Sequence, residues 1–224
     1  MPSKKLQIDS SQTPGKTKDS IGEALVFDFD GVIADTEPMY WRAWQELLKD
    51  YDLPFAWADY CRIGRGIRDE AILVSLATMV SDAEVMTRIR KRMPECAEKV
   101  RSWMLDQPPI SDATVQLLKS LEGRALGLVT TSNRADVEAL LRRKGFADCF
   151  KACVFGEEVT RHKPDPAPYL LIREKLGVRG GIVFEDSEAG LLSAAKAGFK
   201  CIRVSTPGDL PKLVGDALGL ASSQ

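Results

Sequence analysis

The second half of the chain alternates short apolar runs with segments of helical periodicity, and this alternation limits the possible folds more than any other feature. The expected strands span residues 125–129, 152–155, 182–184 and 200–204, and the expected helices span residues 112–121, 135–144, 168–176 and 188–197. Strands that alternate with helices and short turns in this way form a parallel sheet with right-handed crossovers. The sequence therefore predicts an α/β fold.

An earlier apolar run, at residues 24–27, ends directly at Asp28 and predicts one more strand, buried on both faces of that sheet. Residues 37–107 are helical in pattern and contain no convincing strand. The predicted fold is therefore a Rossmann-like parallel sheet core with an α-helical cap inserted after the first strand. The expected parts are a flexible leader at residues 1–20, a core domain at residues 21–36 and 108–224, and a cap domain at residues 37–107.

The composition excludes several classes of protein. The chain has 31 Lys and Arg against 32 Asp and Glu, so its net charge of -1 gives no general attraction for nucleic acid or an anionic membrane. The five cysteines are scattered and lack CxxC pairs, which predicts reduced thiols in an intracellular protein. No apolar run approaches the ~20 residues of a membrane span, and no secretory signal is evident. We therefore expect a cytoplasmic monomer whose partner is a small molecule, with no nucleic acid and no membrane as partner.

Polar side chains follow three of the predicted strands at the point where each strand ends. They are Asp28 and Asp30 after the first strand, Thr130, Thr131 and Ser132 after the second, Glu185 and Asp186 after a later one, and Lys163 in a neighbouring loop. Because the carboxyl ends of parallel strands meet at one edge of a sheet, we expect these side chains to converge. Taken singly, each has an ordinary structural explanation, such as an acidic turn, a strand-end hydroxyl, a surface lysine or a helix cap.

The residue types at this edge suit phosphoryl transfer. Carboxylate oxygens suit Mg²⁺, which proteins hold through one or two carboxylates together with phosphate oxygens and water. Lys163 and the hydroxyl groups are donors that can offset the charge of a phosphoryl group. Asp28 can attack phosphorus as a carboxylate nucleophile. Asp30 can protonate the departing alkoxide and later deprotonate the water that hydrolyses the intermediate.

Four segments carry a resemblance to a known family. They are DFDGVIADTE, VTTSN, HKPDP and FEDSEAG, in this order along the chain. They resemble the four motifs of the haloacid dehalogenase superfamily, and the helical insertion is similar to the small cap of its β-phosphoglucomutase and phosphoglycolate phosphatase-like members. The resemblance covers residues from about 24 to 204. It implies a magnesium-dependent phosphatase that acts through an aspartyl-phosphate intermediate.

The resemblance also implies roles for individual residues. Asp28 is the implied nucleophile, Asp30 the general acid and base, Thr130 a phosphate-binding hydroxyl, and Lys163 the cation that holds both nucleophile and phosphate. The implied Mg²⁺ ligands are the Asp28 carboxylate, the Asp30 backbone carbonyl and Asp186, with Glu185 either a direct ligand or a neighbour of the ligands. The candidate contacts to substrate or phosphate are Gly31, Thr131, Ser132, Asn133, Arg65 and Arg68; the two arginines are alternatively a solvated face of the cap.

The favoured function is hydrolysis of a small phosphorylated metabolite, such as a sugar phosphate or phosphoglycolate, with the cap domain closing over the site. The alternative is a sugar-phosphate mutase similar to β-phosphoglucomutase, although Tyr40 occupies the position of that enzyme's cap histidine. A receiver-like signalling domain and a catalytically inactive phosphate-binding protein are the remaining alternatives. The helical insertion and the Asp28–Asp30 pair fit a receiver domain poorly.

Overall fold

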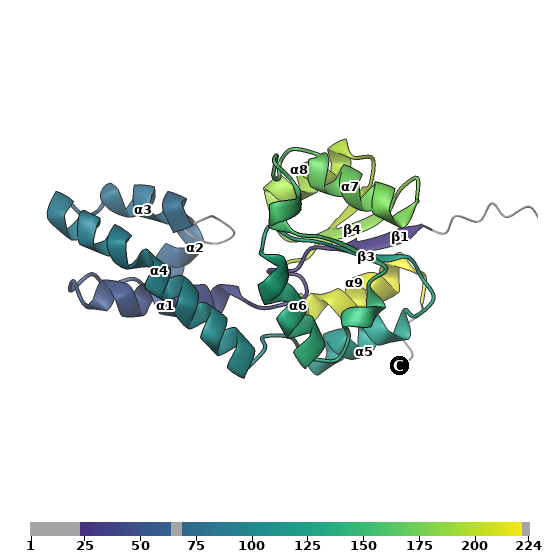
Figure 1. The fold of residues 1–224 in the computed structure, drawn as a ribbon, viewed down its shortest axis with the longest axis horizontal. Helices are drawn as coiled ribbons and strands as arrows, with labels where there is room; N and C mark the ends of the chain where they lie inside the picture. The colour runs from purple at the N-terminus through teal and green to yellow at the C-terminus, as the bar shows by residue number, and fades with distance from the viewer. Residues whose placement is uncertain (1–22, 64–68, 221–224) are drawn as a thin grey trace, which may run out of the picture.

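Five parallel strands form one sheet in the order β3-β2-β1-β4-β5 (Figure 1). The computed structural model describes residues 23–63 and 69–220. The strands are β1 (Ala24–Phe27), β2 (Leu126–Val129), β3 (Ala152–Val154), β4 (Gly181–Glu185) and β5 (Lys200–Arg203). This topology confirms the predicted α/β class. It differs from the 2-1-3-4-5 order of receiver domains, which excludes that alternative.

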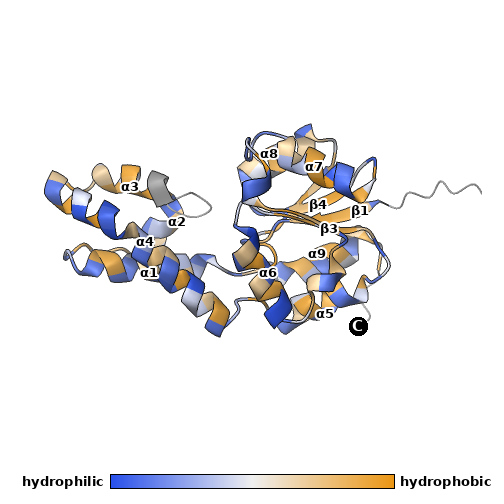
Figure 2. Ribbon diagram, in the orientation of Figure 1, coloured by the Kyte–Doolittle hydropathy of each residue, from blue (hydrophilic) through white to orange (hydrophobic). Residues whose placement is uncertain are grey.

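The strand β1 is buried on both faces, as its unbroken apolar run predicts. Leu25 and Phe27 belong to the hydrophobic cluster on one face of the sheet, and Ala24 and Val26 to the cluster on the other. The ring of Phe27 stacks on that of Phe184 in β4, with centroids 5.1 Å apart. Figure 2 shows the resulting apolar layer of strands between helices that are apolar on one side only. A central strand with two buried faces holds the residues that follow it in a fixed position.

Helices cover both faces of the sheet (Figure 1). Helices α7 (Ala167–Leu176) and α8 (Glu188–Lys196) lie on one face, and α5 (Asp112–Ser120), α6 (Arg134–Arg143) and α9 (Leu210–Ala217) lie on the other. Short 3₁₀ turns at Ala147–Cys149, Gly156–Glu158 and Pro207–Asp209 complete this part of the chain. The positions of α5 to α8 agree with the sequence prediction to within one or two residues, and α9 was not predicted.

The described helices that follow β1 and precede α5 form the predicted insertion (Figure 1). They are α1 (Glu37–Lys49), α2 (Trp57–Ile63), α3 (Asp69–Ala77) and α4 (Ala83–Asp106). Helices α1 and α4 lie side by side, and their buried residues include Trp44 from α1 and Ile89 from α4. The segment Ala83–Asp106 is one continuous helix. It is capped by the Asp82 carboxylate, which accepts from the backbone N–H groups of Glu84 and Val85.

Several sequence predictions fall on residues that the structure does not describe. The leader at residues 1–20 lies outside the described residues, as do Arg65 and Arg68. The division into a core and a cap domain at residues 36/37 and 107/108 stays a prediction. Among the residues that the structure describes, no helix combines the length and the apolar character needed to cross a membrane.

Candidate active site

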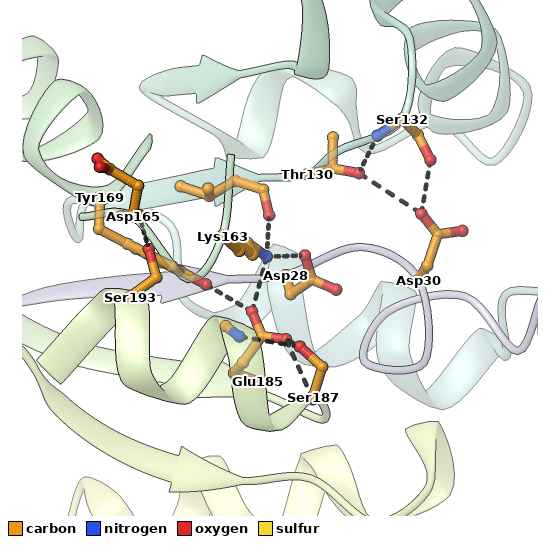
Figure 3. A network of polar contacts seen from close by, with 12 residues as sticks. Asp28, Asp30, Thr130, Ser132, Lys163, Asp165, Tyr169, Glu185, Ser187 and Ser193 are labelled. Carbon is orange, nitrogen blue, oxygen red and sulfur yellow. Dashed lines mark hydrogen bonds and ion pairs between the residues drawn. The ribbon is translucent and has the colours of Figure 1, made fainter. Parts of the chain in front are cut away.

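The ammonium group of Lys163 lies at the centre of a buried polar network at the carboxyl edge of the sheet (Figure 3). Its Nζ lies 2.5 Å from Asp28 Oδ1 and 2.7 Å from Glu185 Oε2, and all three side chains are less than a tenth exposed. Asp28 follows β1, Glu185 ends the neighbouring strand β4, and Lys163 reaches both from the loop before α7. The predicted convergence of these three residues is therefore present in the fold.

Glu185 is held by protein donors at both of its carboxylate oxygens. Oε2 accepts from Lys163 and from the hydroxyl of buried Tyr169, at 2.7 and 2.6 Å. Oε1 accepts from the backbone N–H and the hydroxyl of Ser187, at 3.2 and 2.7 Å. A carboxylate has about four acceptor sites, so these donors occupy all of them. A Cβ on Gly190 would lie 2.0 Å from Glu185 Cδ, so only glycine leaves room for this carboxylate.

The charges in this network influence one another strongly. Burial and the negative charge of Glu185 raise the pKa of Asp28 well above its ordinary value. Burial also opposes ionisation of Glu185, but the adjacent Lys163 and the hydroxyl donors hold the pKa of Glu185 below its usual range. Burial acts to lower the pKa of Lys163, and the carboxylates outweigh it, so that pKa is raised. Glu185 and Lys163 therefore favour their ionised forms, whereas Asp28 ionises less readily than an ordinary aspartate.

Three carboxylates at this edge could share a metal ion. Single oxygen atoms of Asp28, Glu185 and Asp186 all lie within 4.8 Å of one another. Burial and the charge of Glu185 raise the pKa of Asp186 to about 7. With all three ionised and one ammonium present, two negative charges are uncompensated, and these match a divalent cation. This oxygen-rich donor set fits Mg²⁺.

Gly31 lies directly against the carboxylate of Asp186. A Cβ at this position would come 2.3 Å from Asp186 Oδ2, and the backbone φ of +77° favours glycine. The sequence predicts Gly31 as a place where the backbone turns close to phosphate. In the structure the missing side chain makes room for Asp186.

Asp30 is oriented by hydroxyl groups from two directions (Figure 3 shows Thr130 and Ser132). Ser132 Oγ donates to Asp30 Oδ2 at 2.7 Å, and Thr130 Oγ1 lies 3.5 Å from the same oxygen. Buried Thr36 donates to Asp30 Oδ1 at 2.9 Å. The sequence predicts that Asp35 or Thr36 caps α1. Thr36 is the N-cap residue, but its side chain makes no capping hydrogen bond and donates to Asp30 instead.

Next to Asp30 is a cavity of about 510 Å³ between α4 and α6. Its polar lining residues include Asp30, Tyr40, Thr131, Ser132 and Asn133. Thr131 and Asn133, which the sequence predicts as substrate contacts, are exposed to solvent at this cavity. The cavity does not include Asp28 or Lys163. It therefore adjoins the site on the side of Asp30.

The structure brings together most of the predicted residues, and it adds residues that the sequence did not indicate. Tyr169 and Thr36 were missed as partners of Glu185 and Asp30, because a buried tyrosine and a threonine before a helix carry no pattern of their own. Ser187 could have been found, because a serine directly before a helix is a common N-cap. Its hydroxyl accepts from the N–H of Gly190 and caps α8, the structural role considered above for Glu185 and Asp186.

A parallel sheet with a buried lysine at its acidic edge, and with a helical insertion after its first strand, is typical of one class of α/β enzymes. Comparison with family models identifies it further. Residues 25–204 match the family described as haloacid dehalogenase-like hydrolase, and the chain belongs to this family.

Individual relatives agree with this assignment. The chain is 33% identical over 182 residues to the phosphorylated carbohydrates phosphatase of Thermotoga maritima, covering 80% of this chain and 83% of the relative. It is 33% identical over 186 residues to the fructose-1-phosphate phosphatase of Escherichia coli, covering 80% and 95%. A solved structure of a candidate β-phosphoglucomutase from Thermotoga maritima superimposes with a TM-score of 0.68 at 25% identity, covering 87% of this chain and 99% of the other.

Proposed function

We propose that this enzyme is a Mg²⁺-dependent phosphatase that hydrolyses a small phosphorylated metabolite through an aspartyl-phosphate intermediate. The observation that carries the proposal is the contact of Asp28 with buried Lys163, beside two further carboxylates at the edge of the sheet. The phosphatase relatives support it, since both named relatives act on phosphorylated carbohydrates according to their names. We also propose that residues 37–107 form a separate cap domain over this edge.

The residues around Asp28 can perform both halves of the reaction. An Asp28 carboxylate oxygen attacks phosphorus, and the bond from phosphorus to the leaving alcohol oxygen breaks. Asp30 donates a proton to that oxygen, and the alcohol leaves. In the second half, Asp30 takes a proton from water, the water oxygen attacks phosphorus, and the bond to Asp28 breaks to release inorganic phosphate. Lys163 stabilises the negative charge on the phosphoryl oxygens and on Asp28.

The acidic residues at this edge have two different proposed roles: some bind Mg²⁺, and Glu185 holds Lys163 in place. When bound, Mg²⁺ supplies positive charge that offsets the repulsion between the nucleophile and the phosphoryl oxygens. Asp28, Asp186 and the backbone carbonyl of Asp30 are the proposed ligands. Glu185 has no acceptor site left, because Lys163, Tyr169 and Ser187 occupy its oxygens. We therefore assign Glu185 to holding Lys163 in place rather than to direct metal binding.

The test is hydrolysis of p-nitrophenyl phosphate and of a panel of metabolite phosphates, with and without Mg²⁺. We expect turnover that requires Mg²⁺ and is abolished by Asp28→Asn, a change that keeps the size of the side chain. Asp148→Asn, in the 3₁₀ turn far along the chain, is the control for loss of one carboxylate. Absence of activity across the whole panel would refute the proposal.

A second candidate function is sugar-phosphate mutase activity, favoured by the likeness to the solved candidate β-phosphoglucomutase. Tyr40 lies at the cavity beside Asp30, in the position where the mutase carries a histidine. This difference favours hydrolysis. A bisphosphorylated sugar intermediate, detected during turnover of a sugar phosphate, would identify a mutase instead.

A further inference from the structure

The cavity between α4 and α6 is mainly apolar. Val100, Met104 and Leu105 line it from α4, Leu140 lines it from α6, and Phe29 lines it from the loop after β1. Its volume of about 510 Å³ is that of a pocket for a small organic molecule. Asp30 forms part of its wall. A molecule in this cavity can therefore touch both the proposed acid and an apolar surface.

The chemistry of Asp30 indicates which part of a substrate lies here. This step rests on the proposed function. An acid that protonates the leaving oxygen must lie within hydrogen-bond distance of it. In the proposed function the phosphoryl group binds at Asp28 and Lys163, which do not line the cavity, whereas Asp30 does. We therefore infer that the alcohol part of the substrate reaches past Asp30 into the cavity.

The charges in the cavity decide which alcohols suit it. Among the described residues that line it, the one cation is Arg101 of α4, and its guanidinium is 2.5 Å from Asp136 of α6. This ion pair leaves Arg101 without an uncompensated charge to offer a ligand. The remaining charged group is Asp30, which is anionic when it acts as a base. Of the described lining residues, an anionic group in the cavity would therefore meet no unpaired cation and one carboxylate.

We propose that this cavity selects phosphate monoesters of uncharged alcohols, and that Asp136 determines the selection by neutralising Arg101. Phosphate esters with a carboxylate or a second phosphate on the alcohol part are poor substrates. Rejection arises because an anion would have to displace Asp136 from Arg101 before it gained a partner. The proposal narrows the substrate class to compounds such as monophosphates of neutral sugars and polyols.

A matched pair of substrates tests the charge alone. Ethylene glycol monophosphate and 2-phosphoglycolate have nearly the same size and differ in a hydroxymethyl group against a carboxylate. We expect the native enzyme to prefer ethylene glycol monophosphate in kcat/KM by about tenfold or more, with the difference mainly in KM. In Asp136→Asn, Arg101 becomes available, and the preference falls by about two- to fivefold, the size expected of an exposed charge pair. Because Arg101 is 55% exposed, this change weakens as salt is added.

Two control variants separate this effect from a general change of charge. Asp112→Asn removes a carboxylate from another ion pair, with Lys144, that does not line the cavity, and it leaves the preference unchanged. The double variant Arg101→Gln and Asp136→Asn has no cation to offer and regains the native preference. Equal kcat/KM for the two substrates in the native enzyme, or the same preference in Asp136→Asn, would overturn the inference. Failure of the proposed function is distinguishable, since then neither substrate is hydrolysed.

Discussion

Replacement of Lys163 by methionine isolates the role of the buried ammonium in stability. Methionine has a similar length and fills the space of the lysine side chain, but it removes the charge. Lys163 is the cation in contact with Glu185, so the variant leaves Glu185 as a buried carboxylate without that partner. Glu185 is 1% exposed and retains only the hydroxyl and N–H donors of Tyr169 and Ser187.

The size of the effect follows from this burial. Removing one partner of a buried ion pair costs about 3–5 kcal/mol, because the remaining charge has lost its solvent and its partner. Urea unfolding of a small protein has a slope of about 1–3 kcal/mol per molar. We therefore expect the midpoint of unfolding in urea to fall by roughly 2 M at pH 8.

The loss of stability in Lys163→Met depends on pH, because it depends on the ionisation of Glu185. Without Lys163, burial raises the folded-state pKa of Glu185 above its unfolded value of about 4.3. A carboxyl group with a raised pKa favours folding at low pH, and that contribution is lost as the pH rises through the folded-state pKa. The stability difference between the native protein and Lys163→Met is therefore largest at pH 8 and shrinks toward pH 5.

Urea titrations followed by tryptophan fluorescence, in the presence of a chelator and at pH 5 and pH 8, measure this difference. The matched control is Lys163→Met combined with Glu185→Gln, which removes the unpaired charge and recovers most of the lost stability. A loss of less than about 1 kcal/mol at pH 8, or an equal loss at both pH values, would refute the reasoning, because it is no larger than the loss of an exposed ion pair.

Three further predictions concern the acid, the metal site and the space around Glu185. Asp30→Ala retains the fold, shown by an unchanged far-UV circular dichroism spectrum, and loses turnover by a factor of about 10² or more, because it removes the proposed general acid and base. Mg²⁺ affinity, measured by titration calorimetry, rises with pH through pH 7, because Asp186, with a pKa of about 7, and Asp28, whose pKa is also raised, must lose their protons to bind. Gly190→Ala lowers the free energy of unfolding by about 1–3 kcal/mol, because its Cβ displaces the Glu185 carboxylate.

Each of these has an outcome that contradicts it. Substantial hydrolysis by Asp30→Ala would show that another group transfers the proton. A Mg²⁺ affinity that is constant between pH 5.5 and 8 would show that the ligands are already ionised at the lower pH. An unchanged stability of Gly190→Ala, when Gly215→Ala in α9 is compared as a helical glycine with more space, would show that Glu185 can move aside at no cost.

The parts of the site that could be predicted from sequence are those at strand ends. The run of residues 24–27 marks a buried strand, and a parallel sheet brings the ends of such strands to one edge whatever the loops do. This reason suffices to place Asp28 near Glu185 and to bring Thr130 to the same edge. Lys163 could be placed there because its motif lies between two strands of that sheet.

The remaining partners depend on contacts that no local pattern records. Thr36 precedes a helix, where capping is the usual role of a threonine, and only the turn after β1 directs its hydroxyl to Asp30. Arg101 and Asp136 meet because α4 lies beside α6, although 35 positions separate them. Sequence periodicity thus determined the sheet and its acidic edge. The tertiary structure decided which hydroxyl groups orient Asp30, which donors occupy the oxygens of Glu185, and which carboxylate pairs with Arg101 at the cavity. These contacts exist only after distant segments have packed together.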